Sequence, residues 1–513
     1  MAVRALTAFL LAAFRFRRRP LPRSLAIVLA AAKEVPTWKS DLKAITIELM
    51  RTRDTAKISE QMRTEVFPAL SRLAPEINDK IDQGEFQMES LMEGGNPEWE
   101  EMLSRDGLGD KLRQMSEIQA EGGDIYMSSF AKLKHYPFFN EVANWFLPFD
   151  PDLSDVAQID TPAGGMARTI QRMPLLCDSD KYSIILSLSS MPSSARQVAQ
   201  NAMDGENEQF NQMLSELEKA DAKNDRRSIA NNFVRDLYRF CNLFRRKAEF
   251  FNPFEHNVNL LQISAVADDF DDLETLNVIA EFCIKHGFWN EGEHLLKRID
   301  RLSEPSDRRA QKLGYCIDCQ GRYLEAVSHY EEAEMLGGAG PWLLRRMARA
   351  LRRAGKVARA LDCYRRLLES EPDNVTTIIE VAGAALEANQ PVEAESLFHK
   401  AVYLDEHNLE ARRGLAWAQF LNHKFDDADR SYSALLEQEP SAEDHLNAGH
   451  VARALSQTKR AIANYAAFAK ANPDDPDALA NALSTDRRWL IDAGIDTAAD
   501  RLFIEATLLN HNN

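Results

Sequence analysis

Apolar residues in the second half of the chain recur at helical spacing inside a longer unit of about 34 residues. A turn position repeats at Gly287, Gly321, Gly355, Asn389 and His423, each 34 residues after the last, and then at Ser456 and Gly494 after 33 and 38 residues. Five residues after most of these positions comes a small residue, and four later a large one, as in Ala326 and Tyr330. Small residues let two helices approach closely, and large ones fill the gap between successive units.

The same pattern decides the fold class. No stretch of convincing length alternates between apolar and polar residues, so we expect an all-α protein. We predict an α-solenoid of helix hairpins, preceded by a helical N-terminal domain. Five segments are expected: N-terminal helices (1–80), an aromatic-rich region of helices and loops (81–165), a helical connector (166–271), about six repeats (272–476) and C-terminal capping helices (477–513).

Residues 272–476 resemble tetratricopeptide (TPR) repeats, for which a 34-residue unit with these landmarks is typical. Segments of the N-terminal half resemble a family of uncharacterised bacterial TPR proteins, chiefly from Bacteroidetes: Leu49–Asp54, Asn96–Glu100, Glu121–Asp124, Phe138–Phe149 and Asp236–Phe240. The resemblance implies a helical N-terminal region, and it supplies no activity. Relatives of this kind run longer before the point that matches Arg4, so we expect the chain to be a fragment or to start late.

Composition narrows the class of protein. With 45% hydrophobic and 27% charged residues, the chain reads as a soluble globular protein. A net charge of −17 argues against general nucleic-acid binding. The six cysteines follow no disulfide framework, which favours a reducing, cytoplasmic location. Cys316 and Cys319 form a CxxC pair without a second pair of ligands, so we interpret them as part of a helix and expect no metal or cofactor.

The N-terminus combines apolar runs with arginines. Residues 5–14 and 25–32 are apolar, and Arg15, Arg17, Arg18, Arg19 and Arg23 lie between them. We favour a helix, a turn at Pro20 and Pro22, and a second helix. Two alternatives stay open: an export or membrane-surface signal, giving an envelope-associated role, and contact with an anionic polymer. No segment is long and apolar enough for a transmembrane span.

The densest aromatic segment, residues 135–149, allows two interpretations. Its rings either pack a joint between the N-terminal helices and the solenoid, or form an exposed surface for a partner. Residues 82–105 are acidic and rich in turn formers, and residues 202–225 read as an acidic helix or tether.

No catalytic motif stands out, so we predict a protein that is not an enzyme. Phosphate-binding glycine loops, HExxH and GxSxG are all missing from the sequence. An unrecognised enzymatic N-terminal domain is the alternative, with four polar candidates near the aromatic segment. These are Asp124, His135, Glu141 and Asp150.

The repeats suggest a binding groove. In a TPR solenoid, positions 2, 5, 9, 12 and 13 of the first helix of each unit line the concave surface. Counting from the start of each helix selects Tyr315, Trp342, Arg345, Arg349, Arg352, Arg353, Arg413, Trp417, Phe420, His450 and Arg453. Arginine binds carboxylate or phosphate oxygens in a bidentate way, and aromatic rings add stacking. We therefore expect a scaffold that binds an extended acidic peptide or protein segment.

Two further alternatives stay open for these repeats. The arginines could instead be solvated charges paired with Asp and Glu of adjacent helices. Open ends of a solenoid often associate, so a homo-oligomer is also compatible with the sequence.

Overall fold

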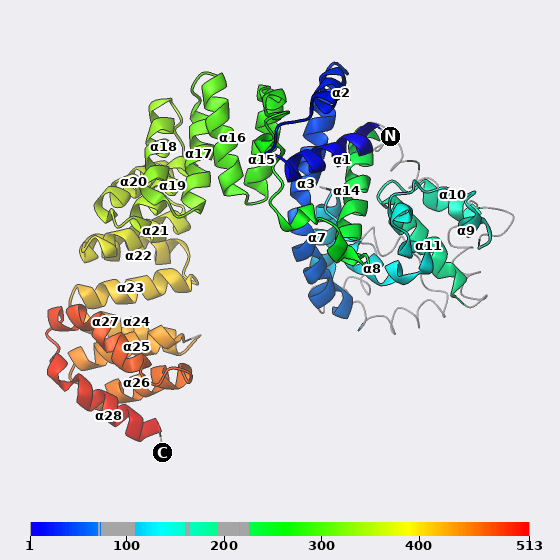
Figure 1. Cartoon of the computed structure of the whole chain (residues 1–513). Coiled ribbons are helices and arrows are strands. Elements are labelled where there is room, and N and C mark those ends of the chain that lie inside the picture. The colour runs from blue at the N-terminus through cyan, green and yellow to red at the C-terminus, as the bar shows by residue number, and fades with distance from the viewer. Residues whose placement is uncertain are drawn as a thin grey trace. The chain divides into compact units, whose positions relative to one another are not determined.

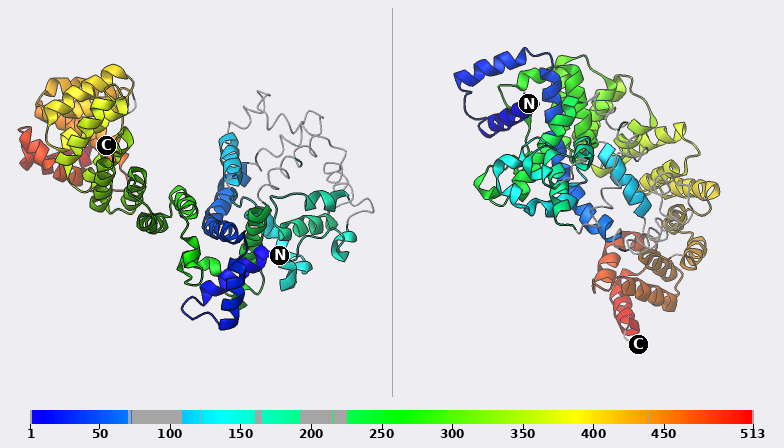
Figure 2. Two further views of the ribbon diagram at one scale, coloured as in Figure 1. Left: turned by 90° about the horizontal axis from the view of Figure 1, so that it is seen from above. Right: turned by 90° about the vertical axis from the view of Figure 1, so that its right-hand side faces the viewer.

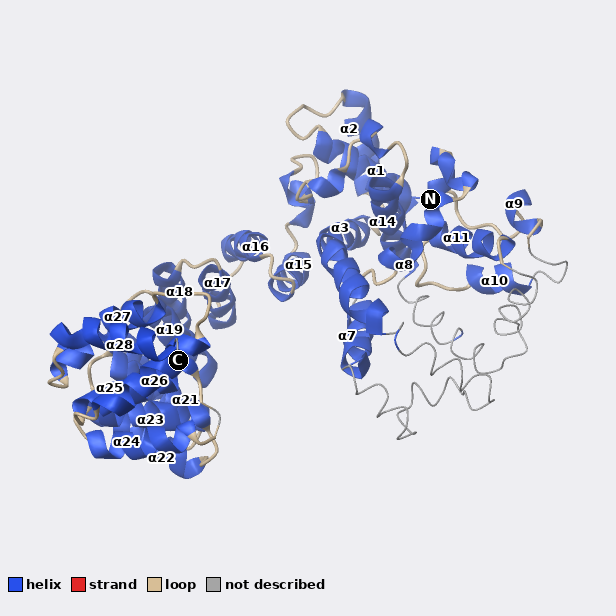
Figure 3. Ribbon diagram, turned by 90° about the horizontal axis from the view of Figure 1, so that it is seen from below, coloured by secondary structure: helices blue, strands red, loops and turns tan. Residues whose placement is uncertain are grey.

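The computed structural model describes residues 2–69, 72, 108–120, 122–159, 165–191, 215, 225–438 and 440–511. These residues form helices and connecting loops, with no strand among them (Figure 3), which confirms the all-α prediction. The acidic segment 82–105 and nearly all of 202–225 lie outside the described residues. The chain divides into two compact units, residues 1–279 (unit 1) and 280–513 (unit 2).

Unit 1 is built around two long helices in contact, α3 and α14 (Figure 1). Its helices are α1 (Ala2–Arg15), α2 (Arg23–Lys33), α3 (Trp38–Gln61), α7 (Leu108–Ala120), α8 (Met127–Ala131), α9 (Ser154–Ala157), α10 (Gly165–Gln171), α11 (Asp178–Ser189) and α14 (Asp225–Leu243). A π-helical turn, Met62–Val66, continues α3, and short 3-10 turns connect other elements. The helix–turn–helix predicted for the N-terminus is present as α1 and α2, and α1 packs against α14.

Three rings of the aromatic segment 135–149 lie in the interior of unit 1. Phe139, Trp145 and Phe149 are buried with residues of α10, α11 and α14 in one apolar cluster. The ring of Trp145 contacts those of Phe240 and Phe244, and its Nε1 donates a hydrogen bond to the Phe139 carbonyl oxygen at 2.8 Å. These rings therefore serve the core of this unit, and the rings of Tyr136, Phe138 and Phe146 pack against it while partly buried.

Unit 2 is a series of helix hairpins in chain order (Figure 1). The helices of the repeats are α15 (Leu273–Lys285, which spans the boundary between the units), α16 (Trp289–Leu302), α17 (Asp307–Cys319), α18 (Tyr323–Met335), α19 (Pro341–Arg353), α20 (Val357–Ser370), α21 (Val375–Glu387), α22 (Pro391–Leu404), α23 (Leu409–Leu421), α24 (Phe425–Leu436), α25 (Ala442–Ala454) and α26 (Thr458–Ala471). Two further helices, α27 (Ala478–Asp492) and α28 (Asp500–His511), contact α26 and each other. The predicted solenoid of hairpins is therefore confirmed.

Every predicted turn position has a left-handed backbone. The glycines 287, 321, 355 and 494 have φ between 71° and 79°, and Asn389, His423 and Ser456 have φ of 58° or 59°. Glycine adopts this conformation without steric cost, whereas other residues adopt it rarely. The conformation is thus a property of the hairpin and persists where the sequence departs from glycine.

The landmark residues of the second helices fill the space between hairpins. The small landmark residues are fully buried: Ala326, Ala360, Ala394, Ala428 and Ala461. The large landmark residues are at most 1% exposed in four repeats: Tyr330, Tyr364, Tyr432 and Tyr465. On the facing first helices, a residue without a side chain makes room for these rings. A Cβ added at Gly314 would lie 2.7 Å from the Tyr330 ring, and one at Gly449 would lie 2.4 Å from the Tyr465 ring.

This close approach predicts a difference between two helical glycines. Gly449→Ala forces a methyl group against a fully buried ring whose hydroxyl is 2.9 Å from His450 Nδ1, so the ring has little freedom to move. We expect a loss of about 1–3 kcal/mol in the free energy of unfolding, as for overpacked cores. Gly383→Ala is the matched control, since nothing lies within 4 Å of its added Cβ. It should stabilise the protein by up to about 1 kcal/mol through helix propensity.

Urea unfolding of both variants measures this difference. Equal effects of the two substitutions would show that the approach of Gly449 to Tyr465 is not tight.

Candidate functional site

Three of the predicted groove residues of α19 form ion pairs within the solenoid. Arg345, Arg349 and Arg352 are bound to carboxylates at the end of α20 or in α21, the first helix of the next repeat. Arg345 contacts Glu371 at 2.7 Å and Glu380 at 3.1 Å. Arg349 also contacts Glu380, and Arg352 Nε lies 2.9 Å from both carboxylate oxygens of Glu387. These arginines connect α19 to the next hairpin.

Similar ion pairs join neighbouring hairpins along the rest of the solenoid. The two partners are 28 to 32 residues apart in the chain, which is nearly one repeat. They are Lys312 with Glu281, Arg322 with Glu293, Arg359 with Glu331, Arg366 with Glu334, Arg365 with Glu393, Lys424 with Glu395, Arg413 with Asp444 and Arg460 with Asp429. Each partly exposed pair contributes about 0–1 kcal/mol. Many charged side chains of this solenoid therefore form ion pairs between repeats. This agrees with the alternative left open by the sequence, in which the arginines pair with Asp and Glu of adjacent helices.

Three of the predicted groove residues are buried. Phe420 and His450 have no exposed surface, and the side chain of Arg453 is 2% exposed. Nδ1 of His450 lies 2.9 Å from the Tyr465 hydroxyl and its Nε2 lies 3.3 Å from Asp486 of α27, and burial lowers the pKa of its imidazole. Arg453 contacts Asp500 of α28 at 2.7 Å.

The burial of His450 and Arg453 has a physical reason. The helices α27 and α28 pack onto the last repeat and cover the surface that the same positions leave open elsewhere. His450 and Arg453 are therefore corrected from groove residues to core residues. Phe420 is also a core residue, because its ring packs among those of Trp417, Phe425 and His450.

An aromatic and cationic cluster remains exposed to solvent near the start of unit 2. The Tyr315 ring of α17 lies edge-on to the rings of Trp289 and Trp342, with centroid distances of 5.4 and 6.1 Å. The guanidinium of Arg346 lies over Tyr315 at 4.5 Å and near Trp342 at 5.8 Å. Trp342 is 45% exposed, and Arg346 is half-buried. We call Tyr315, Trp342 and Arg346 the recognition cluster.

The sequence analysis selected Tyr315 and Trp342 and missed Arg346, because counting placed this arginine off the groove. The signal was nevertheless present, since Arg346 is four residues after Trp342 and therefore on the same face of α19. Arg346 also lies 3.8 Å from Asp318, whose carboxyl pKa is raised by burial.

The remaining predicted residues have mixed surroundings. Arg353 is exposed, and its guanidinium lies 5.6 Å from the centre of the Tyr323 ring. Arg413 is bound to Asp444, which also caps α25. Trp417 is half-buried and stacks on Phe420 at 5.1 Å. Of the original set, Trp342 and Arg353 are exposed, and Tyr315 and Trp417 are half-buried.

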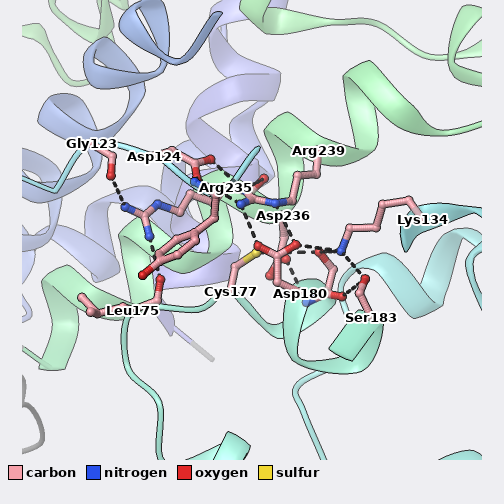
Figure 4. Close-up of polar contacts among 12 residues, drawn as sticks. Gly123, Asp124, Lys134, Leu175, Cys177, Asp180, Ser183, Arg235, Asp236 and Arg239 are labelled. Atoms are coloured by element: carbon pink, nitrogen blue, oxygen red, sulfur yellow. Dashed lines mark hydrogen bonds and ion pairs between the residues drawn. The ribbon is translucent and has the colours of Figure 1, made fainter. Parts of the chain in front are cut away.

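Unit 1 contains a second polar assembly, buried in its interior (Figure 4). Arg239 of α14 binds Asp124 with two hydrogen bonds, at 2.8 and 3.1 Å, and contacts Asp180 of α11 at 2.7 Å. Lys134 Nζ contacts the same Asp180 at 2.9 Å and donates hydrogen bonds to Ser179 and Ser183. We call Asp124, Lys134, Asp180, Asp236 and Arg239 the buried network. Each has less than one tenth of its surface exposed.

One carboxyl of the buried network has a raised pKa, and a neighbouring arginine, Arg235, binds backbone carbonyl groups. Burial raises the pKa of the Asp236 carboxyl to about 6, with a further contribution from the charge of Asp178. Asp236 accepts a hydrogen bond from the Ser179 backbone N–H at 3.0 Å. One turn before Arg239, Arg235 donates hydrogen bonds to the carbonyl oxygens of Leu175, Gly122 and Gly123.

These contacts fix the loop around Gly122 and Gly123 against α14. The glycine pair is therefore a structural turn.

The polar candidates for an enzymatic N-terminal domain do not form a common site. Asp124 is engaged by Arg239, whereas His135, Glu141 and Asp150 are exposed. Among the residues that the structure describes, no group of His, Cys, Asp and Glu could hold a metal ion. Cys316 is buried and Cys319 is exposed on α17. The buried network is thus interpreted as a structural element that joins α14, α11 and two loops.

Comparison with known proteins gives the following matches. Family models described as tetratricopeptide repeat match residues 341–384 and 385–448. No curated protein sequence matches the chain.

Solved structures with similarity include a tetratricopeptide repeat protein from Parabacteroides merdae, with 18% identity, coverage of 46% of this chain and 98% of that chain, and a TM-score of 0.35. The C-terminal part of a TPR repeat-containing protein from Cytophaga hutchinsonii has 16% identity, covers 45% and 93%, and also has a TM-score of 0.35. MamA from Desulfovibrio magneticus has 17% identity, covers 33% and 97%, and has a TM-score of 0.31.

Proposed function

Because this chain is a tetratricopeptide repeat protein, we propose that it is an interaction scaffold that binds an extended acidic segment of a partner protein at the recognition cluster. The observation that carries the proposal is the partly exposed contact of the Arg346 guanidinium with the rings of Tyr315 and Trp342. Aromatic residues and arginine dominate binding energy at many protein interfaces. Since the rings hold the guanidinium by stacking, its N–H groups can still donate to a carboxylate.

The ion pairs of α19 refine where an acidic ligand would bind. Arg345, Arg349 and Arg352 already have carboxylate partners, so a ligand would have to displace Glu371, Glu380 or Glu387. Arg346 and Arg353 lie over aromatic rings, and Arg346 lies 3.8 Å from the Asp318 carboxylate, farther than Arg345 and Arg352 lie from Glu371 and Glu387. We therefore place the binding site of the acidic segment at the Arg346 and Arg353 side of α19.

Binding of a labelled peptide tests this proposal. The probe is a fluorescent peptide of about ten residues, rich in Asp and Glu with one Phe, and its Lys-rich counterpart is the charge control. We expect the full chain to bind the acidic peptide, and Trp342→Ala or Arg346→Gln to weaken binding by about tenfold or more, as at a hot spot. Raising the salt concentration should weaken binding further.

Two controls separate this site from other sources of affinity. Tyr403→Ala removes an aromatic residue on α22 that is 89% exposed, and it should leave affinity unchanged. Arg349→Gln removes an arginine of the same helix that is bound to Glu380. A larger effect of Arg349→Gln than of Arg346→Gln would contradict the recognition cluster and favour the broader arginine groove. Equal binding of acidic and Lys-rich peptides would contradict the acidic ligand.

A further inference from the structure

The N-terminal hairpin, α1 and α2, leaves much apolar surface uncovered. In α2 only Leu29 is buried, and Leu25, Ile27 and Val28 are 42%, 64% and 65% exposed. Phe16, directly after the end of α1, is also exposed. The packing of unit 1 does not explain why these apolar side chains are exposed. The ribbon of the hairpin is the dark blue segment in Figure 2.

A pocket of about 300 Å³ lies between the two helices and a neighbouring loop. Its apolar lining comes from Phe9 and Phe16 of α1 and its end, Leu21 and Leu25 around the start of α2, and Ile263 of the loop. Arg17 and Arg19 also line it. The pocket therefore combines apolar walls with cationic groups at one location.

The arginines of the hairpin differ from those of the solenoid. Arg15, Arg17, Arg18, Arg19 and Arg23 are all exposed, and none forms an ion pair with a carboxylate of the described residues. Arg15, Arg17 and Arg19 lie over phenylalanine rings, and Arg17 donates a hydrogen bond to the Phe14 carbonyl oxygen. With +7 in residues 1–33 and −17 overall, the remaining residues carry −24. Cationic charge that is not paired with a carboxylate of the described residues is thus concentrated beside the uncovered apolar surface.

We propose that this hairpin binds the surface of a membrane that contains anionic phospholipids. The exposed side of α2 lies at the boundary between headgroups and acyl chains, and the apolar pocket accepts part of one acyl chain. The five arginines contact lipid phosphates, which a guanidinium binds in a bidentate way. Helices that lie in the interface combine an apolar face with Lys or Arg in this manner.

Charge favours a lipid surface over the other occupants of this face. A second copy of the hairpin would bring arginine against arginine, which is repulsive. An acidic protein would match the arginines but would leave Ile27 and Val28 without an apolar partner unless it also carried one. None of the described helices has the length and composition needed to cross a bilayer, so the proposed attachment is peripheral.

Vesicle flotation with the full chain tests the proposal. We expect binding to vesicles with about one third phosphatidylglycerol, and little binding to vesicles of phosphatidylcholine alone. Raising the salt from about 0.1 M to about 0.5 M should reduce binding, because it screens the arginines. The double variant Arg18→Glu, Arg19→Glu should lower the partition coefficient by about tenfold or more.

The apolar contribution is tested with Ile27→Ser and Val28→Ser together. These exposed residues can be changed without disturbing a core, and we again expect a loss of several-fold in vesicle binding. Val392→Ser is the matched control, since Val392 is 75% exposed on α22. Arg430→Glu in α24 is the control for charge, with a side chain that is 75% exposed.

Insertion is measured with a polarity-sensitive dye at Val28→Cys in a Cys319→Ser background, which removes the exposed native thiol. A blue shift on anionic vesicles, with none for the same dye at Val392→Cys, supports the proposal. Three results would overturn it: equal binding to neutral vesicles, full retention of binding in the Ile27→Ser, Val28→Ser variant, or a dimer in sedimentation that this variant converts to a monomer. The last result would make a second copy the occupant.

Discussion

Replacing Arg239 by Met should destabilise unit 1 by about 3–5 kcal/mol, which is the usual cost of breaking a buried ion pair from one side. The guanidinium is 1% exposed and contacts Asp124 and Asp180, which are themselves buried. Methionine fills a similar volume but leaves the Asp124 carboxylate with no cationic partner that the structure describes. Lys134 still contacts Asp180, so most of the cost should come from Asp124.

Labelling of buried cysteines measures the loss of stability in each unit separately. Cys177 and Cys241 lie in unit 1, and Cys316 and Cys363 are buried in unit 2. Pulsed thiol labelling at increasing urea concentration, followed by mass spectrometry of the peptides, gives an unfolding midpoint for each unit. We expect Arg239→Met to lower the midpoint of Cys177 and Cys241, and to leave that of Cys316 and Cys363 unchanged.

Two further variants show whether the loss is electrostatic. Arg239→Met combined with Asp124→Asn removes the unpaired charge and should recover part of the lost stability. Arg246→Met makes the same change at a residue whose side chain is 61% exposed, and it should shift stability by less than about 0.5 kcal/mol. No recovery in the double variant would contradict the electrostatic explanation.

Asp236→Asn should stabilise unit 1 at neutral pH and have little effect at low pH. In the folded protein burial raises the pKa of this carboxyl from 3.8 to about 6. The folded state therefore binds a proton more strongly than the unfolded state, so the stabilisation from this group is complete below pH 3.8 and is lost as the pH rises through 6. A difference of about two pKa units corresponds to about 3 kcal/mol.

Asparagine removes the ionisable group and keeps an oxygen that can accept the hydrogen bond of the Ser179 N–H. The same labelling of Cys177 and Cys241, with a methanethiosulfonate reagent that reacts at low pH, compares the variant with the original chain at each pH. We expect a gain of about 2–3 kcal/mol at pH about 8 and close to none at pH about 4. A gain of the same size at both pH values would show that ionisation of Asp236 is not its cause.

The measurement must report on unit 1 alone, because a histidine in unit 2 makes stability depend on pH in the opposite direction. Burial lowers the pKa of His450 in unit 2, so the stabilisation connected with this histidine is lost as the pH falls through its unfolded value of about 6.5. A measurement of unfolding over the whole chain would combine the two effects of pH on stability. Labelling of Cys177 and Cys241 reports the effect in unit 1 by itself.

Most of the fold of unit 2 could be predicted from local patterns. The left-handed turns at Asn389, His423 and Ser456 were identified by spacing alone, although none of them is glycine. The small and large landmarks were placed correctly in the core, as Ala326 and Tyr330 illustrate. These predictions succeeded because each hairpin packs mainly on its neighbours, so that a repeated local pattern specifies a repeated structure.

The candidate site was predicted less well. Position along a helix selected Arg349 and Trp342 together, yet Arg349 is bound to Glu380 of α21 and the Trp342 ring lies edge-on to that of Tyr315 of α17. Partners of this kind come from another hairpin, and their side-chain directions depend on how two hairpins pack. Spacing along one helix contains no information on that packing.

The sequence by itself determined the repeat, its turn positions, the residues between hairpins, and the presence of a basic, apolar N-terminus. Only the tertiary structure decided which arginines bind carboxylates, that α27 and α28 cover His450 and Arg453, and that Asp124 meets Arg239 across 115 residues. The reason is physical. Helical period and turn conformation arise from nearby residues, whereas ion pairing and burial depend on segments that only folding brings together.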